Sequence, residues 1–414
     1  MGTDNLRRVA VIGGGAAGMT AAIFAAASGA RVTIYEGTGR LGKKLGITGK
    51  GRCNVTNNSP INTHIENTPT NPRFLYTAHN NFPPEEVMAF FEESGVPLKT
   101  ERGDRVFPAS DKAGDIVGAL KRRVNAAGVA IVYEKVTNIS PQGGGFIVKT
   151  ERGEYPSDAV IIATGGLSYP LTGSTGDGYR FAEAFGHTIV PAKPSLVPVE
   201  CAEKWCREAM GLSLRNVTLT VTDDAGKEVY FEQGEMLLTH FGVSGPLVLS
   251  ASSHMKNLGS GRKYHLTIDL KPALDEQVLD KRLQSDFAKN INRDFVNSLG
   301  ELLPSKLIPI IIRLSGIPER KKVNTITREE RQNLVRLLKA LPLTAVKFRP
   351  IDEAIITSGG VSVKEISPKT MESKLVPGLY FAGEVIDVDA YTGGFNLQIA
   401  FATGRLAGEA SAGW

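Results

Sequence analysis

The sequence predicts an α/β protein in which a parallel-sheet domain is interrupted by an insert of strands followed by helices. Residues 8–36 have the pattern of a strand, a Gly-rich turn, a helix and a second strand. Residues 195–270 alternate apolar and polar positions in short runs, and residues 271–345 change to helical spacing. Gly-rich apolar segments return after residue 345. We therefore expect residues 1–194 and 346–414 to form one domain around the insert.

Composition limits the classes of protein that this chain can belong to. The 414 residues are 42% apolar and 22% charged, which is enough for two or three packed domains and excludes overall disorder. Three cysteines are too few for a disulfide framework, so we expect a reducing, cytoplasmic location. The net charge of +5 is small and its cations are scattered, so charge alone does not imply nucleic acid. Glycines interrupt the first apolar run, and this interruption argues against a signal peptide and against a membrane span.

The Gly-rich turn after the first strand has the spacing of a dinucleotide-binding site. Gly13 permits a tight turn, Gly15 lets a pyrophosphate approach the backbone, and Gly18 allows the helix to pack closely on the strand. The helix that follows directs its N-terminus at the phosphates. Glu36 ends the second strand, where a carboxylate accepts hydrogen bonds from both ribose hydroxyls. This acid disfavours a 2′-phosphate, so the turn predicts FAD or NAD rather than NADP.

Two later segments favour FAD over NAD. Residues 155–170 contain an apolar strand that ends in Ala163, Thr164, Gly165 and Gly166. Residues 376–410 give a strand, an acidic turn, a Gly-Gly turn and an apolar helix, whose positive end would face the flavin pyrimidine. A second complete Gly-x-Gly-x-x-Gly unit is missing, so we expect no dedicated NAD domain, and NADH or NADPH would act as a diffusing reductant. By contrast, residues 57–83 are polar and rich in Asn, Thr and Pro, and we expect a long surface segment there.

Four long motifs, "LGKKLGITGKGRCNVTN", "ATGGLSYPLTGSTGDGY", "LLTHFGVSGP" and "KTMESKLVPGLYFAGEVIDVDAYTGGFNLQIAFATG", resemble those of a bacterial family of FAD-dependent flavoproteins. This family includes aminoacetone oxidase and dehydro-bile-acid reductase. The resemblance implies a discontinuous, glutathione-reductase-like Rossmann domain for FAD, an inserted β-barrel at 195–270 and a helical domain at 271–345. It places the cofactor beside Gly13, Gly15, Ala16, Ala17, Gly18, Glu36, Arg40, Lys44, Gly49, Arg52, Asn54, Val136, Ala163, Thr164, Gly165, Gly383, Glu384, Asp387, Gly394, Phe395, Asn396 and Leu397.

The flavin would carry the redox chemistry, so few side chains need to be catalytic. The candidates are His240, Tyr391 and Cys53. Cys53 has no nearby second cysteine, which favours a buried packing role over redox work. His240 has no carboxylate partner visible in the sequence, and His187 reads as a structural residue at a helix end. We expect no metal site.

The prediction for function is an FAD-dependent oxidoreductase that acts on a small or mid-sized organic molecule by hydride transfer through a non-covalent flavin. Oxygen or NAD(P)H would be the second reactant, and neither nucleic acid nor membrane is expected as a partner. Two alternatives stay open. One is a flavin-dependent RNA-modifying or RNA-associated protein, although the chain has no basic tail. The other is a protein whose flavin is only structural. Neither the substrate nor the oligomeric state follows from the sequence.

Overall fold

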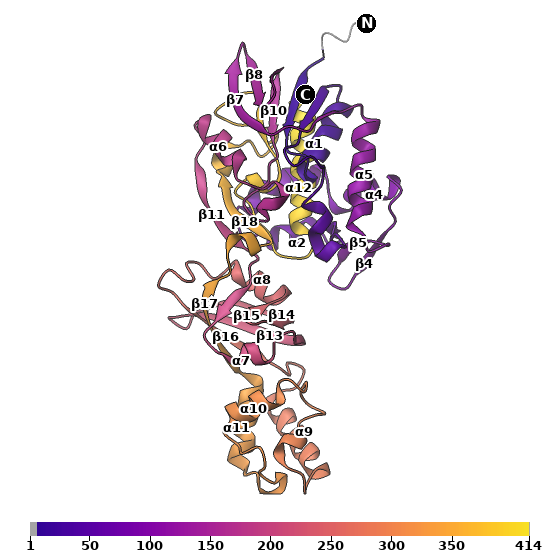
Figure 1. Ribbon diagram of the computed structural model, residues 1–414. Coiled ribbons are helices and arrows are strands. Elements are labelled where there is room, and N and C mark those ends of the chain that lie inside the picture. The colour runs from indigo at the N-terminus through magenta and orange to yellow at the C-terminus, as the bar shows by residue number, and fades with distance from the viewer. Residues whose placement is uncertain (1–5, 414) are drawn as a thin grey trace. The chain divides into compact units, whose positions relative to one another are not determined.

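The computed structural model describes residues 6–413, which divide into two compact units. Of these residues, 6–195 and 351–413 form unit 1, and 196–350 form unit 2 (Figure 1). Each unit has its own buried apolar cluster. The chain therefore leaves the first unit after Ser195 and returns to it at Ile351.

Unit 1 is built on a five-stranded parallel sheet in the order β19-β10-β1-β2-β6. Its strands are short and mostly buried, as expected for a sheet that is covered on both faces. They are β1 (Arg8–Ile12), β2 (Arg31–Tyr35), β6 (Ala130–Val132), β10 (Ala159–Ile162) and β19 (Leu379–Phe381).

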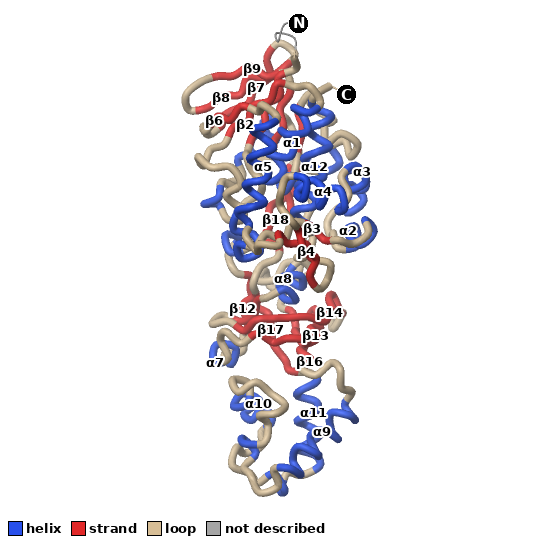
Figure 2. Tube along the Cα trace, turned by 90° about the vertical axis from the view of Figure 1, so that its right-hand side faces the viewer, coloured by secondary structure: helices blue, strands red, loops and turns tan. Residues whose placement is uncertain are grey.

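Helices cover one face of this sheet, and an antiparallel meander packs against it elsewhere. The covering helices are α1 (Ala16–Ala27), α5 (Ala113–Ala126) and α12 (Phe395–Ser411), which lie together in Figure 2. The meander is β7 (Val136–Gln142), β8 (Gly145–Thr150) and β9 (Glu154–Ser157). A Cβ atom on Gly408 of α12 would lie 2.3 Å from the carbonyl oxygen of Ala21 in α1. Glycine therefore lets the two helix backbones touch.

Smaller elements complete unit 1. They are β3 (Thr56–Asn57), α2 (Ile61–Glu66), α3 (Tyr76–Asn81), α4 (Pro84–Glu93), β4 (Leu98–Glu101), β5 (Arg105–Pro108) and α6 (Asp177–Ala184). The strands β11 (Ile189–Ser195) and β18 (Ile356–Val361) pair antiparallel, so the two ends of unit 1 that lead to unit 2 lie side by side.

The expectation of a surface segment at 57–83 is wrong for much of its length. Residues Phe74 and Leu75 are buried in the core of unit 1, and so are the imidazoles of His64 and His79. The sequence does not reveal these core residues, because many polar residues lie between them. In addition, α2 and α3 are each only six residues long, which is too short for a helical period of apolar residues to be recognised.

Unit 2 contains a closed barrel and a group of helices. The barrel order is β12-β15-β14-β13-β16-β17. Its strands are β12 (Val199–Cys201), β13 (Ser213–Asp223), β14 (Glu228–Leu238), β15 (Gly242–Ser244), β16 (Tyr264–Asp269) and β17 (Leu341–Phe348). The helices are α7 (Trp205–Glu208), α8 (Pro246–Ser252), α9 (Glu276–Lys289), α10 (Ile308–Ser315) and α11 (Arg328–Lys339).

The expected limits of the barrel and of the helical part differ from the structure at one strand. We expected the barrel to end at 270, the helical domain at 345 and the first domain to resume at 346. Instead β17 pairs with both β12 and β16 and closes the barrel. A barrel needs a last strand that meets the first, and here that strand lies beyond the whole helical segment, where a local pattern cannot reveal its partners.

Candidate functional site

The Gly-rich turn between β1 and α1 has the geometry that its spacing predicts. Gly13 has a φ of +104°, and a Cβ atom on Gly18 would lie 1.9 Å from the carbonyl oxygen of Gly13. Any side chain at Gly18 would therefore separate helix from turn. A Cβ atom on Gly15, in contrast, would meet no atom within 4 Å. The backbone at the N-terminus of α1 thus has open space beside it, as a pyrophosphate group requires.

Glu36 lies at the end of β2 and reaches back to this turn. Its carboxylate accepts hydrogen bonds from the backbone N–H of Gly14 at 2.9 Å and of Thr38 at 2.7 Å. The residue is 8% exposed. Each carboxylate oxygen keeps a further lone pair, so the side chain can still accept hydrogen bonds from a pair of ribose hydroxyls. Nearby Arg40 is exposed, and Val136 is buried at the start of β7.

A polar network joins three of the segments that the sequence assigns to the cofactor. Lys44 Nζ donates to Ser168 Oγ at 2.6 Å and to Glu384 Oε2 at 2.7 Å. Glu384 Oε1 also accepts from Ser168 Oγ and from the backbone N–H of Thr357. The side chains of Lys44 and Glu384 are 22% and 20% exposed, so their pairing is only partly screened by water. The network therefore holds Lys44 and Glu384 next to each other, as expected if both residues line the predicted cofactor site.

The ends of β10 and β19 bring further predicted residues to the same edge of the sheet. Gly165 has a φ of +73° and Gly383 one of +75°, so both turn the chain immediately after their strands. A Cβ atom on Gly13 would lie 2.6 Å from the carbonyl oxygen of Ala163, which puts the first turn against the end of β10. Thr164 Oγ1 is buried without a hydrogen-bond partner among the described residues.

The N-terminus of α12 is fixed by side chains of its own turn. Asn396 donates to the carbonyl oxygen of Ala390 at 2.7 Å and accepts from its N–H at 3.0 Å. A Cβ atom on Gly394, which has a φ of +103°, would lie 2.3 Å from the backbone of Thr56. Phe395 is buried and Leu397 is partly buried. This close approach locks the first turn of a helix of 17 residues whose dipole favours negative charge at that end.

Asp387 and Asp389 form a buried acidic pair just before this turn. Burial and the neighbouring Asp389 raise the pKa of Asp387, while a hydrogen bond from Asn71 Nδ2 at 3.0 Å opposes the shift. Asp389 accepts from the hydroxyls of Ser195 and Ser358. The prediction that Asp387 binds the cofactor remains a prediction, and its surroundings show a carboxyl that holds its proton more readily than usual.

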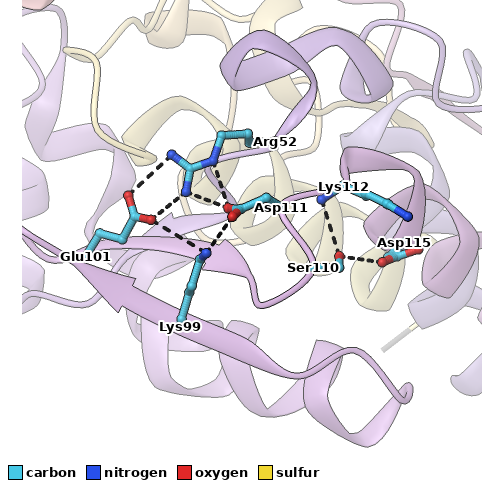
Figure 3. Close-up of polar contacts among 7 residues, drawn as sticks. All are labelled: Arg52, Lys99, Glu101, Ser110, Asp111, Lys112 and Asp115. Carbon is cyan, nitrogen blue, oxygen red and sulfur yellow. Dashed lines mark hydrogen bonds and ion pairs between the residues drawn. The ribbon is translucent and has the colours of Figure 1, made fainter.

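Arg52 and Cys53 lie in the loop 48–54, with Gly49 exposed and Asn54 partly buried beside them. Arg52 forms ion pairs with Glu101 and Asp111 (Figure 3), although we expected its guanidinium to contact the cofactor. Cys53 is fully buried, and burial raises the pKa of its thiol to about 12. A protonated, enclosed thiol is a poor nucleophile and a poor redox partner, which favours the packing role for Cys53.

We therefore expect Cys53→Ser to keep a bound and reducible flavin. The hydroxyl is smaller than the thiol and is buried in its place, so the free energy of unfolding should fall by about 1–2 kcal/mol. Flavin content by absorbance and anaerobic reduction of the variant measure this directly. Loss of turnover with a full complement of FAD would instead give Cys53 a chemical role.

The remaining catalytic candidates occupy different positions. His240 is exposed in unit 2, between β14 and β15, where its ring contacts Phe241. Tyr391 is partly buried in unit 1, on the turn before α12. His187 is buried and structural, since its Nε2 lies 2.8 Å from Ser373 Oγ and its Nδ1 lies 3.4 Å from Glu365. No acidic side chain among residues 6–413 forms an ion pair with His240, so its acid or base role stays a prediction.

Sequence reasoning missed Ser168, Thr357 and Asn71, which all contact residues of the predicted site. Ser168 lies within the quoted motif of residues 163–179 and could have been found there. Thr357 follows the insert by only a few residues, and nothing in its local pattern distinguishes it from other strand residues. Among residues 6–413, no three side chains of His, Cys, Asp or Glu gather as metal ligands, and no helix is long and apolar enough to cross a membrane.

The residues of unit 1 fit FAD. Open space beside Gly15 suits the pyrophosphate, and Glu36 has free acceptor capacity for the adenosine ribose. Thr164 Oγ1, which lies on the segment next to the turn, and Asn54 Oδ1 are buried polar atoms that still need partners. The fold and this site together define an FAD-dependent oxidoreductase with a Rossmann domain.

Comparison with known proteins gives the family. Residues 7–410 match the model described as the HI0933-like protein Rossmann domain, and the chain belongs to this family. It is 33% identical to a 3-dehydro-bile acid delta(4,6)-reductase of Clostridium scindens, over 98% of this chain and 99% of the relative. It is 32% identical to a ribosomal RNA dihydrouridine synthase of Haemophilus influenzae, over 95% of each chain.

The fold is also similar to that of a solved dehydrogenase. The 3-ketosteroid delta1-dehydrogenase of Sterolibacterium denitrificans matches 98% of this chain and 99% of its own, with a TM-score of 0.54 and 13% identity. Identity at this level supports the shared fold alone.

Proposed function

We propose that this protein reduces a carbon–carbon double bond conjugated to a carbonyl group in a small or mid-sized organic molecule, with NADH or NADPH as the electron source. The observation that carries the proposal is the match over 98% of the chain to a reductase whose name describes a ketone with conjugated double bonds. When bound and reduced by NADH or NADPH, FAD would supply the hydride for the β-carbon of such a system. A proton then adds to the α-carbon, which leaves the saturated ketone.

The residues of the site support this chemistry through charge and hydrogen bonding. Lys44 uses two of its three N–H groups on Ser168 and Glu384, which leaves one for an acceptor on the cofactor or the substrate. A fixed cation beside a carbonyl oxygen would stabilise the negative charge that hydride addition places there. Asp387, whose pKa is raised, is a candidate source of the proton.

The test is an anaerobic reaction in two stages. The holoprotein is first mixed with NADH or NADPH, and bleaching of the flavin spectrum identifies the reductant. The reduced protein is then mixed with a 3-oxo-4-ene steroid, and we expect recovery of the oxidised flavin spectrum together with loss of the enone absorbance. The saturated ketone with the same skeleton is the control and should leave the flavin reduced. Recovery at the same rate with both compounds would contradict the proposal.

A second candidate substrate is a uracil base within RNA, which carries the same conjugated arrangement. Two observations favour it. One is the relative named a ribosomal RNA dihydrouridine synthase. The other is charge: residues 271–340 contain 14 Lys and Arg against 9 Asp and Glu, an excess equal to the net charge of the whole chain. A basic helical segment suits a polyanion. Reoxidation of the reduced flavin by a uridine-containing RNA, and by no steroid, would select this candidate.

We also propose a cytoplasmic location. The thiols of Cys53, Cys201 and Cys206 are all free, as expected in a reducing compartment.

A further inference from the structure

The loop 48–54 follows an unusual backbone path. Gly49, Lys50, Gly51 and Cys53 all have positive φ angles, of 56°, 57°, 85° and 60°. The left-handed region is free of penalty for glycine but unfavourable for Lys50 and Cys53, which carry a Cβ atom. Such a path persists only where the surrounding structure fixes it, and it is typical of ligand-binding loops.

The inner side of the loop is held by the core of unit 1. The N–H of Cys53 donates to the carbonyl oxygen of Thr48 at 3.1 Å, and Thr48 Oγ1 donates to that of Leu45 at 2.7 Å. The Cys53 side chain is fully enclosed. These contacts anchor both ends of the loop but do not reach its outer side.

The outer side is held by Arg52 through the charged cluster of Figure 3, which we define as Arg52, Lys99, Glu101 and Asp111. Arg52 Nε donates to Asp111 Oδ1 at 2.8 Å, and its Nη2 donates to Glu101 Oε1 at 2.5 Å. Lys99 Nζ closes the cluster with a 2.7 Å bond to Asp111 Oδ2. The guanidinium also stacks on Phe107, with its carbon 4.2 Å from the ring centroid. The cluster connects the loop to β4 and to the segment after β5.

We propose that Arg52 is a positioning residue, which keeps the loop 48–54 in its FAD-binding conformation through Glu101 and Asp111 and does not itself contact the cofactor. The guanidinium directs Nε, Nη1 and Nη2 at carboxylates and one face at Phe107, so most of its hydrogen-bonding capacity is used within the charged cluster. Of the three loop residues that the sequence predicts at the cofactor, Gly49 and Asn54 then remain as those that contact FAD.

The two roles for Arg52 predict opposite effects when its acidic partners are neutralised. If the guanidinium bound a phosphate of FAD, Glu101→Gln with Asp111→Asn would free it and would leave FAD affinity equal or higher. If Arg52 acts through the cluster, the same double variant must weaken FAD binding, although neither acid lies on the loop.

The experiment measures the Kd of FAD for the apoprotein by quenching of flavin fluorescence. For Arg52→Met and for the double variant Glu101→Gln, Asp111→Asn, we expect Kd to rise by about three- to tenfold, the range for a partly exposed ion-pair network. Combining all three changes should add little, because they remove one set of contacts. Arg52→Lys should recover only part of the affinity, since lysine lacks the planar fork.

Asp115→Asn is the matched control, because Asp115 is an exposed acid of the same region that bonds to Ser110 and not to Arg52 (Figure 3). Its Kd should equal that of the unaltered protein. Hydrogen exchange of the amides of residues 48–54 in the apoprotein gives an independent measure and should accelerate in Arg52→Met. Unchanged or tighter FAD binding in the double variant, or an unchanged exchange rate in Arg52→Met, would overturn the proposal. Both measurements are independent of the substrate, so failure of the proposed reduction leaves this result intact.

Discussion

Replacing Glu36 by alanine should lower the affinity for FAD by at least about a hundredfold. A charged carboxylate that accepts two ribose hydroxyls contributes about 1.5–3 kcal/mol for each bond, and alanine supplies neither. In the apoprotein the same carboxylate binds the N–H groups of Gly14 and Thr38, so its loss also loosens the turn that receives the pyrophosphate. Titration of the apoprotein with FAD and the flavin content of purified protein measure both consequences.

Two further variants make this result specific. Glu92→Ala removes an exposed acid of α4 in the same unit and should retain full flavin content. Glu36→Gln keeps one acceptor oxygen and should fall between the unaltered protein and Glu36→Ala. Circular dichroism of each apoprotein checks that the fold is intact. A folded Glu36→Ala protein with normal FAD content would remove Glu36 from the adenosine site.

Acidification from pH 6.5 to pH 5 should destabilise unit 1 by about 2 kcal/mol through His79 alone. Burial, together with the smaller effect of the neighbouring His64, lowers the pKa of His79 to about 3; the two ring centroids are 5.4 Å apart. The unfolded chain binds a proton near pH 6.5, whereas the folded chain does not. Stability from this residue is therefore complete above pH 6.5 and is lost as the pH falls toward 3. Urea unfolding at a series of pH values measures the slope of the free energy of unfolding against pH.

His79→Leu tests the assignment of that slope. Neither ring nitrogen of His79 has a hydrogen-bond partner among the described residues, so an apolar side chain of similar size removes a buried polar group as well as a titrating one. We expect the variant to be at least as stable at pH 7 and to lose less stability between pH 6.5 and pH 5. His64 and His187, whose pKa values are also lowered by burial, account for the slope that remains. An unchanged slope would show that His79 is not the residue that titrates.

Much of the site could be predicted because its signals are local. Gly13, Gly15 and Gly18 act within six residues, and Glu36 ends the strand next to theirs. Each of these residues is constrained by its immediate backbone neighbours, so the spacing in the sequence carries the information. The family motifs extended the same reasoning to the ends of β10 and β19, which the parallel sheet brings to one edge.

Other features were beyond such reasoning because they depend on partners far away in the chain. Arg52 illustrates the difference: the motif predicted a loop at the cofactor, but the acids that bind Arg52 come from β4 and from the segment after β5. His79 is similar, since a histidine among polar residues gives no sign that α12 will cover it. In both cases the sequence gives the chemistry of the side chain but does not show which residues surround it in the folded protein.

The sequence by itself determined the Rossmann sheet, the phosphate-binding turn, the preference for FAD and the presence of an insert, because each follows from short-range spacing and periodicity. Only the tertiary structure decided that β17 closes the barrel and that Lys44 pairs with Glu384, which Ser168 and Thr357 also contact. It also decided that a charged cluster joins the loop 48–54 to β4 and to the segment after β5. These are contacts between residues separated by tens to hundreds of positions. The energies of these contacts depend on which surfaces meet in the folded protein. The spacing of residues along the chain does not show which surfaces will meet.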